Sequence, residues 1–265
     1  MQPVTHPTNI NDIFPSFIQT FVCSHNKLQY MPLKFPNSLQ YLDCCYNRLK
    51  QLPLILPNSL ETLHCNDNCL KQLPSILPNS ITDLYCHDNQ LTKFPNKLPV
   101  SLKYLYCNNN RLAHLPNLPN GLAILICCDN LLKQLPDLPN SLKNLRCGNN
   151  QITELPSNLP PYLEVLSCQD NQLTKLPINF PPSMVRFNCS RNKYLYIPKK
   201  YAKRFELIET PNYNQKALII QRIWRRIKYK QIIVKMILDN DNVLSNSFKS
   251  YGDLNIVYLI AKYVI

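Results

Sequence analysis

The stretch that decides the fold is residues 59–79, which read SLETLHCNDNCLKQLPSILPN. Two leucines precede Cys65, and a third follows Asn68 at a fixed offset. The same arrangement recurs along most of the chain at steps of 20 or 21 residues. Self-similarity at a fixed period of this length is the signature of a solenoid, in which stacked units bury one continuous core that no single unit could bury alone.

Nine asparagines mark the repeat, and each follows a cysteine by three residues. These asparagines, which we call the ladder asparagines, are Asn26, Asn47, Asn68, Asn89, Asn110, Asn130, Asn150, Asn171 and Asn192. The cysteines, which we call the ladder cysteines, are Cys23, Cys44, Cys65, Cys86, Cys107, Cys127, Cys147, Cys168 and Cys189. Free cysteine is among the most buried residue types, so we expect these nine to be small apolar side chains of the core. Each asparagine amide is expected to bond the backbone of the turn and of the neighbouring unit.

The unit resembles a leucine-rich repeat, whose pattern is L-x-x-L-x-L-x-x-N-x-L, with cysteine in place of the third leucine. The doubled Leu-Pro, as at Leu52-Pro53 and Leu56-Pro57, is similar to the short repeats of bacterial type III effectors. The resemblance covers nine units. It implies an α/β-type solenoid, a leucine-rich repeat arc with short parallel β-strands on the concave face and an extended, polyproline-II-like convex side.

The repeats set the predicted organisation of the chain. We expect an N-terminal lead over residues 1–15, nine repeats over 16–197, and a C-terminal helical segment in a basic tail over 198–265. Two units lack one residue of the outer wall, between prolines at 116–119 and at 136–139. Because the missing residue falls outside the strands, the strand register should survive.

Alternation along each strand separates the inward from the outward side chains. In the quoted unit Leu63 and Cys65 should be buried, while His64 should face outward. Four turns carry an acid directly before the asparagine; these acids are Asp67, Asp88, Asp129 and Asp170. Such side chains bond the backbone in turns, so we expect them to organise the turns rather than to bind cations.

The composition narrows the function. The chain of 265 residues has only 3 glycines, too few for a glycine-rich phosphate loop. No apolar run approaches the roughly 20 residues that a membrane-spanning helix needs. The cysteines lack the spacing of a metal site, and adjacent pairs such as His64 and Cys65 point to opposite faces of a strand. We therefore expect no enzymatic activity, no metal and no cofactor.

The cysteines and the first residues bear on location. Residues 1–20 have neither a basic end nor an apolar core, so a secretory signal is not expected. Repeated cysteines without such a signal indicate a reducing, cytoplasmic compartment. The bias toward Asn, Ile, Lys and Tyr suggests an AT-rich genome of a virus or protist, and hence a host cytoplasm. Cys45, Cys69 and Cys128 are not ladder cysteines, and we expect their side chains to be exposed.

The outward strand positions hold the predicted binding residues. Solenoids bind partners through the concave face. We expect Tyr85, Tyr104, Tyr106, Ile124 and Ile126, from three consecutive units, to form one exposed patch. Tyrosine is enriched in interface hot spots, although the strand propensity of these residues is the alternative explanation. The predicted function is protein–protein recognition through this face.

The tail is a second candidate for docking. Most of the net charge of +13 lies in residues 199–235. Segment 220–233 resembles a degenerate IQ motif, the helix that binds calmodulin-family proteins, with Arg226 where glycine is usual. The resemblance implies that a calmodulin-like partner contacts Ile220, Gln221, Trp224, Arg225, Lys230 and Ile233. A cap on the solenoid, an anionic membrane surface and, least favoured, nucleic-acid phosphates are the alternatives.

A role in a ubiquitin-type pathway is the alternative for the whole chain. The effectors that the repeats resemble often carry a separate ubiquitin-ligase domain with a C-x-D nucleophile motif. Cys127-Cys128-Asp129 has those letters but lies inside a repeat, and the tail is too short for that domain. The resemblance therefore implies the scaffold and not the ligase activity. An adaptor or effector module remains the alternative function, together with membrane-surface association through the tail.

Overall fold

The computed structural model describes residues 15–197 together with Tyr201 and Phe205. The chain divides into two units, residues 1–209 and 210–265, and the described residues all belong to the first. These residues form nine short strands. The strands are β1 (Thr20–Val22), β2 (Tyr41–Asp43), β3 (Thr62–His64), β4 (Asp83–Tyr85), β5 (Tyr104–Tyr106), β6 (Ile124–Ile126), β7 (Asn144–Arg146), β8 (Val165–Ser167) and β9 (Arg186–Asn188).

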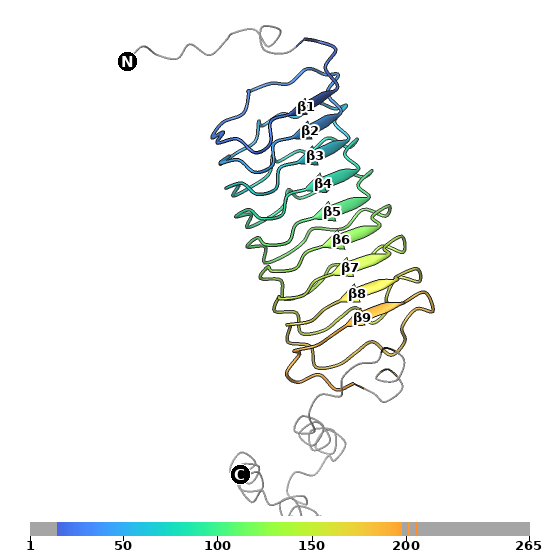
Figure 1. Ribbon diagram of the computed structural model, residues 1–265. Coiled ribbons are helices and arrows are strands. Elements are labelled where there is room, and N and C mark those ends of the chain that lie inside the picture. The colour runs from blue at the N-terminus through green and yellow to red at the C-terminus, as the bar shows by residue number, and fades with distance from the viewer. Residues whose placement is uncertain (1–14, 198–200, 202–204, 206–265) are drawn as a thin grey trace, which may run out of the picture. The chain divides into compact units, whose positions relative to one another are not determined.

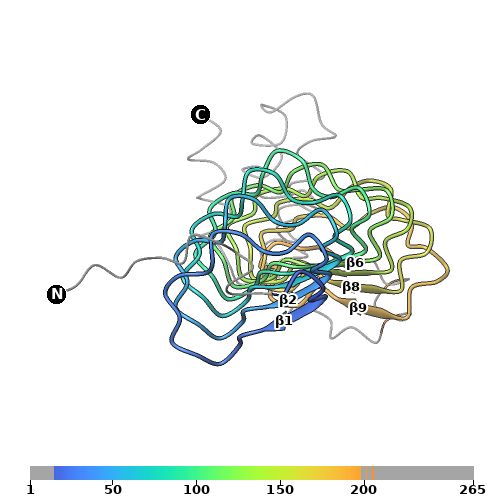
Figure 2. The ribbon, with the colours of Figure 1, turned by 90° about the horizontal axis from the view of Figure 1, so that it is seen from above.

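The nine strands form one parallel sheet in the order of the chain (Figure 1). Each strand pairs with the strand one repeat later, so that equivalent residues lie side by side, as Leu63 and Leu84 do. Seen from above, the strands gather on one side of the coil and the rest of each repeat returns around the other side (Figure 2). Residues 15–197 therefore form a parallel β-solenoid, as the repeat predicts.

The two shorter repeats keep this register, as expected. Tyr104 pairs with Ile124, and Ile124 pairs with Asn144, so each step across these strands is one residue shorter than the others. The missing residue is absorbed in the outer wall, at 116–119 and 136–139. The outward positions of β5, β6 and β7 consequently stay aligned.

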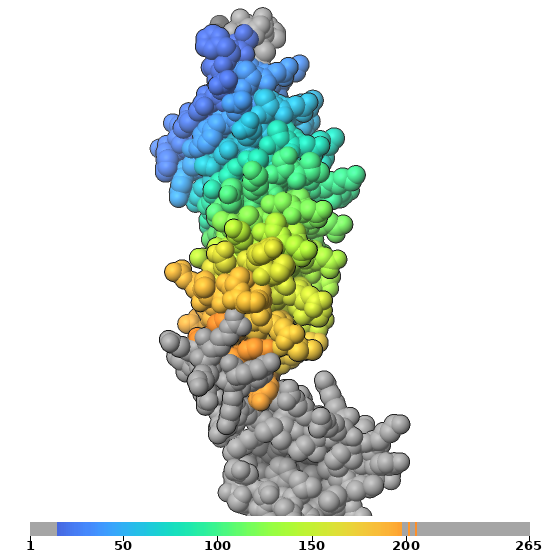
Figure 3. All heavy atoms as spheres, turned by 90° about the vertical axis from the view of Figure 1, so that its right-hand side faces the viewer, coloured from blue at the N-terminus to red at the C-terminus, as the bar shows by residue number. Residues whose placement is uncertain are grey.

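The inward side chains form one continuous core. In the third repeat Leu60, Leu63, Cys65 and Leu70 have no exposed area. The central residue of every strand from β2 to β9 is likewise buried. Burying one leucine contributes roughly 1.5–3 kcal/mol, and neighbouring repeats supply the surface that buries it. Figure 3 shows the repeats as successive bands in chain order.

Between the strands the repeats run through bends, turns and irregular backbone, and residues 15–197 contain no helix. Proline fixes φ and offers no N–H, which suits segments outside the sheet. Leu52 and Leu56, each followed by a proline, are buried and close the core on the side of the outer wall. No helix within the described part of the chain is long and apolar enough to cross a bilayer. The expected C-terminal helical segment lies outside the described residues and stays a prediction.

Aromatic rings close the core beside β9. The ring centroid of Phe180 lies 4.8 Å from that of Phe187, 4.7 Å from that of Tyr201 and 5.3 Å from that of Phe205. Tyr201 is buried, and its hydroxyl donates to the carbonyl oxygen of Ile178. These contacts cover apolar side chains that the last repeat would otherwise expose. Capping by the later IQ-like helix concerns residues outside those described.

Candidate functional site

The register of β4, β5 and β6 brings the five predicted patch residues together. Tyr85 pairs with Tyr106, and Tyr106 pairs with Ile126. Beside this row, Tyr104 pairs with Ile124. All five residues are partly exposed, whereas the leucine between them in each strand is buried. We call these five residues the aromatic–aliphatic patch, and the surface formed by the outward strand positions the strand face.

Two residues that the sequence reasoning missed extend this surface toward β2. The ring of His64 lies 4.3 Å from that of Tyr85 and 5.3 Å from that of Tyr41, centroid to centroid. Tyr85 in turn stacks on Tyr106 at 4.4 Å and an interplanar angle of 6°. The Tyr41 hydroxyl lies 3.3 Å from Nδ1 of His64. His64 has the same repeat offset as Tyr85 and Tyr106, and this offset is the signal that could have found it.

Burial sets the protonation of these rings. It raises the pKa of Tyr85 to about 12, an effect to which Tyr106 and Asp83 add. Tyr85 therefore keeps its phenolic proton at physiological pH. Burial lowers the pKa of His64 from its ordinary value, although Asp43 and Asp83 act in the opposite direction. His64 is therefore neutral near pH 7, and the ring surface has an apolar body with neutral polar tips.

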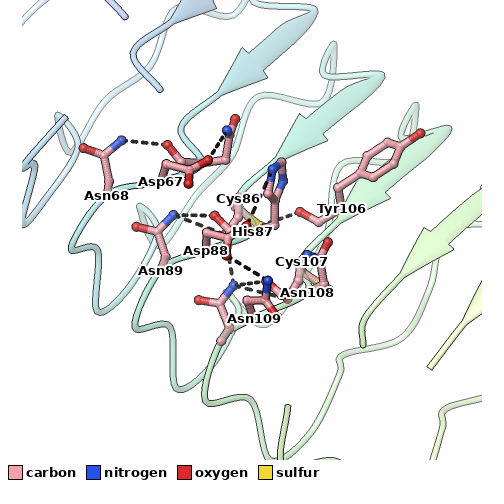
Figure 4. A network of polar contacts seen from close by, with 12 residues as sticks. Asp67, Asn68, Cys86, His87, Asp88, Asn89, Tyr106, Cys107, Asn108 and Asn109 are labelled. Carbon is pink, nitrogen blue, oxygen red and sulfur yellow. Dashed lines mark hydrogen bonds and ion pairs between the residues drawn. The ribbon is translucent and has the colours of Figure 1, made fainter. Parts of the chain in front are cut away.

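The ladder asparagines hold the turns that follow the strands (Figure 4). The Asn89 amide nitrogen donates to the carbonyl oxygens of Cys86 (3.3 Å) and His87 (3.1 Å), and to that of Cys65 one repeat earlier (3.0 Å). Its Oδ1 accepts the backbone N–H of Leu70 at 2.9 Å. Equivalent bonds recur at the asparagines after β2 to β9. These side chains are fully engaged within the fold, as the sequence predicts.

The residue before each ladder asparagine adopts the left-handed backbone conformation, with φ between 51° and 56°. Asp and Asn tolerate this region better than other residues with a side chain, and they occupy it in six of the nine turns. The acids also bond between turns. Asp88 Oδ1 accepts from the Asn109 amide at 2.8 Å, and Asp129 accepts from Asn149. The acids organise the turns as expected, but through side-chain partners rather than through the expected backbone bonds.

One group of potential metal ligands lies at this edge. The ligand atoms of Asp67, His87 and Asp88 lie within 4.8 Å of one another, the only such group that the described residues form. Asp67 already accepts a hydrogen bond from Asn66 at 2.8 Å, and Asp88 accepts one from Asn109. Because these carboxylates are engaged in the turn network, we assign no metal to the group (Figure 4).

The cysteine ladder is part of the core. From Cys44 to Cys189 all eight ladder cysteines are buried, and Cys23 in the first repeat is partly buried. Burial raises the pKa of these thiols, to about 12 at Cys189. The Cys86 thiol donates to the carbonyl oxygen of Tyr106, one strand along, at 3.4 Å. Since the thiolate is the nucleophile and the metal ligand, these protonated thiols suit packing and not chemistry.

The expectation that Cys45 is exposed is wrong. Cys45 is buried, with 9% of its surface exposed, and its backbone N–H donates to Oδ1 of Asp43 at 3.0 Å. Cys69 and Cys128 keep part of their exposure, in line with the expectation for them.

The predicted site in the tail lies outside the described residues. Its residues are Ile220, Gln221, Trp224, Arg225, Lys230 and Ile233. The calmodulin-like partner therefore stays a prediction from the sequence.

Solved structures resemble the chain, whereas no protein-family model and no curated protein matches it. YopM from Yersinia enterocolitica is 33% identical over 67% of this chain and 43% of its own, with a TM-score of 0.55. The leucine-rich effector YopM from Yersinia pestis is 34% identical over 64% of this chain and 54% of its own, also with a TM-score of 0.55. This chain thus spans about half the length of these two proteins.

A third structure shares the fold alone. The functional domain of InlJ from Listeria monocytogenes, which includes a cysteine ladder, is 22% identical over 73% of this chain and 48% of its own, with a TM-score of 0.57. The described part of the chain is therefore a parallel β-solenoid whose structural neighbours are leucine-rich repeat proteins.

Proposed function

We propose that the chain is a non-enzymatic recognition module that binds a partner protein through the strand face, with the aromatic–aliphatic patch as the main contact. The main support for this proposal is that β4, β5 and β6 present two adjacent rows of tyrosine and isoleucine with partly exposed side chains. Tyrosine buries a large area on binding and keeps a polar tip. The leucine-rich repeat neighbours, one of them an effector, support a role in protein recognition.

Preorganisation favours this surface over the outer wall. The wall also exposes apolar side chains, among them Leu54 (84% exposed) and Ile76 (78% exposed). Those side chains stand on bends of the backbone outside the sheet. On the strand face, by contrast, pairing fixes the backbone, and ring contacts fix Tyr85 and Tyr106. Side chains that are already ordered lose less entropy on binding, so the same buried area yields more affinity.

Affinity capture from a cytosolic extract tests this proposal. The baits are the full chain, the patch variant Tyr104→Ala/Ile124→Ala and the outer-wall control Leu54→Ala/Ile55→Ala. The patch variant removes neighbouring side chains of β5 and β6 and leaves the stack of Tyr85 on Tyr106 in place. We expect proteins that the full chain and the control retain and that the patch variant loses. Capture of the same proteins by all three baits, with unchanged thermal unfolding, would contradict the proposal.

From the sequence alone, we also propose that the tail docks a calmodulin-family protein. Support comes from the IQ-like spacing around Ile220 and Gln221. Trp224 is the single tryptophan of the chain, so its fluorescence reports on this segment. We expect its emission to shift when calmodulin is added at micromolar concentration. An unchanged spectrum both with and without calcium counts against the partner.

The twelve cysteines support a further proposal about location. All of them are free thiols, and eight of the ladder set are buried in the core. We propose that the chain works in a reducing compartment such as the cytoplasm, where such thiols persist.

A further inference from the structure

Formal charges on the strand face are segregated along the sheet. Among the outward strand residues, the acids are Asp43 on β2 and Asp83 on β4, and the bases are Arg146 on β7 and Arg186 on β9. The aromatic–aliphatic patch lies between Asp83 and Arg146. The strand face therefore changes in chain order from acidic, through aromatic and aliphatic, to basic.

These four charges are available to a partner. None of them forms an ion pair with another described residue, since the ion pairs in that part of the chain are those of Asp88, Glu154 and Asp170. Arg146 and Arg186 are exposed. Asp43 and Asp83 are partly exposed, and each accepts a hydrogen bond from a neighbouring neutral group, which leaves its charge uncompensated.

The surroundings of each charge favour a particular side chain. Asp83 pairs in register with Tyr104, so a cation placed there meets a carboxylate and a phenol ring together. Both attract a lysine or arginine side chain. Arg146 pairs with Ile126, so its guanidinium borders apolar surface. A planar guanidinium binds a carboxylate through two parallel hydrogen bonds, which become stronger when the bound segment excludes water from them.

The spacing of the strands sets the spacing of the complementary charges. β4 and β7 are three steps apart, and a step of about 4.8 Å amounts to about 14 Å across the strands. Asp83 is the first residue of β4 and Arg146 the third residue of β7, so an offset of about 7 Å along the strands brings their separation to about 16 Å. An extended chain advances about 3.3 Å per residue, so this distance corresponds to about five residues. A partner segment of that length can reach both charges while its central side chains cover the patch.

We propose that the strand face binds an extended segment of a partner polypeptide with a basic side chain at Asp83, apolar side chains on the aromatic–aliphatic patch, and an acidic side chain at Arg146 about five residues away. This proposal rests on the proposed function and specifies its ligand. Nucleic acid does not fit, because the acidic half of the strand face repels phosphate. Asp43 and Arg186 extend the same polarity beyond the segment and fix its direction.

Selection from a displayed library of random dodecapeptides tests the charge pattern. The library is selected separately on the full chain, on Asp83→Lys and on Arg146→Glu. Two control variants, Lys133→Glu and Asp137→Lys, reverse exposed charges outside the strands. We expect the full chain and both controls to enrich peptides with a basic and an acidic residue about five positions apart around an apolar centre. Arg146→Glu should lose the acidic preference, and Asp83→Lys the basic one.

Binding of the best enriched peptide gives the quantitative measurement. We expect each strand-face reversal to raise its dissociation constant at least about tenfold, and each control to leave it within about twofold. Enrichment without a charge pattern, a pattern that both reversals leave unchanged, or no enrichment at all would overturn the proposal. Circular dichroism checks that each variant is folded.

The patch variant Tyr104→Ala/Ile124→Ala separates this proposal from the proposed function. If it loses the selected peptides while the charge reversals change nothing, the patch binds a polypeptide and the charge pattern is wrong. If it keeps the peptides at full affinity, the patch is not the contact and the proposed function fails as well.

Discussion

At the scale of the residue, one asparagine per repeat does what a buried turn requires. The amide nitrogen of Asn130, for example, donates to three backbone carbonyl oxygens, and its Oδ1 accepts one backbone N–H. Four backbone groups are thus satisfied where water cannot reach. Leucine and cysteine fill the space around it without adding groups that need strong hydrogen bonds. The side chains that hold the fold are therefore engaged inward, and recognition is left to the outward ones.

Replacing Asn130 by alanine should destabilise the chain by about 2–4 kcal/mol, because the Leu112 N–H and three carbonyl oxygens lose their partner. Urea unfolding followed by circular dichroism gives the change. Asn26→Ala is the matched control, since the Asn26 side chain is exposed and bonds only carbonyl oxygens of its own turn. Equal losses in the two variants would show that the bonds between repeats do not matter.

At the scale of the element, the left-handed residue before each asparagine makes the turn. Strand, turn and asparagine come as one unit, because the left-handed backbone reverses the chain so that the next amide can reach back into the core. Asn and Asp supply this conformation at low cost in most repeats. Tyr46 and Arg191 adopt the same φ region without that preference, which shows that the stack imposes the turn even on an unsuited side chain.

Asn149→Val should cost about 1–2 kcal/mol, because a β-branched side chain crowds the backbone at φ 52°. Asn149→Gly should stay close to the parent chain, because glycine adopts positive φ freely. Both variants lose the bond to Asp129, so their difference isolates the backbone effect. The two thermal midpoints decide the matter, and similar midpoints would show that this turn does not need the left-handed conformation.

At the scale of the whole molecule, stability should be a sum over similar repeats and their interfaces. Every repeat pairs only with the repeats before and after it, and its core side chains meet their equivalents on both sides. No contact between distant repeats holds the coil closed within the described residues. The patch and the charges around it therefore keep their spacing through local pairing alone.

Removal of residues 59–79, one whole repeat, should leave a cooperatively folded chain with a lower urea midpoint, because Asn58 then joins Ser80 in the same register. Removal of residues 59–68 alone should abolish folding, since it removes β3 and its turn but leaves the outer-wall segment 69–79 without a strand of its own. A half-repeat deletion that folds as well as the whole-repeat deletion would contradict the stacked register.

Much of this could be predicted from the sequence, because the spacing of Leu, Cys and Asn encodes the inward direction directly. The patch followed from the same spacing. The sequence-based prediction was wrong for the burial of Cys45 and did not include His64 in the ring surface. The burial of Cys45 is set by packing within the turn after β2, and the ring row through His64 depends on side-chain orientation across strands. The spacing of Leu, Cys and Asn encodes neither, so it could not reveal them.

The central claim is that the ladder sulfurs point into a stacked core and leave the strand face for recognition. Labelling of the native chain with iodoacetamide at about pH 8.5, near the ordinary cysteine pKa, tests it when mass spectrometry identifies each modified site. Burial raises the pKa of the ladder thiols, so at this pH they hold less thiolate than an ordinary cysteine and are also shielded. We expect Cys69 and Cys128 to be modified first, and Cys65, Cys107 and Cys147 only after denaturation. Modification of these three in the native chain as fast as that of Cys69 would contradict the account.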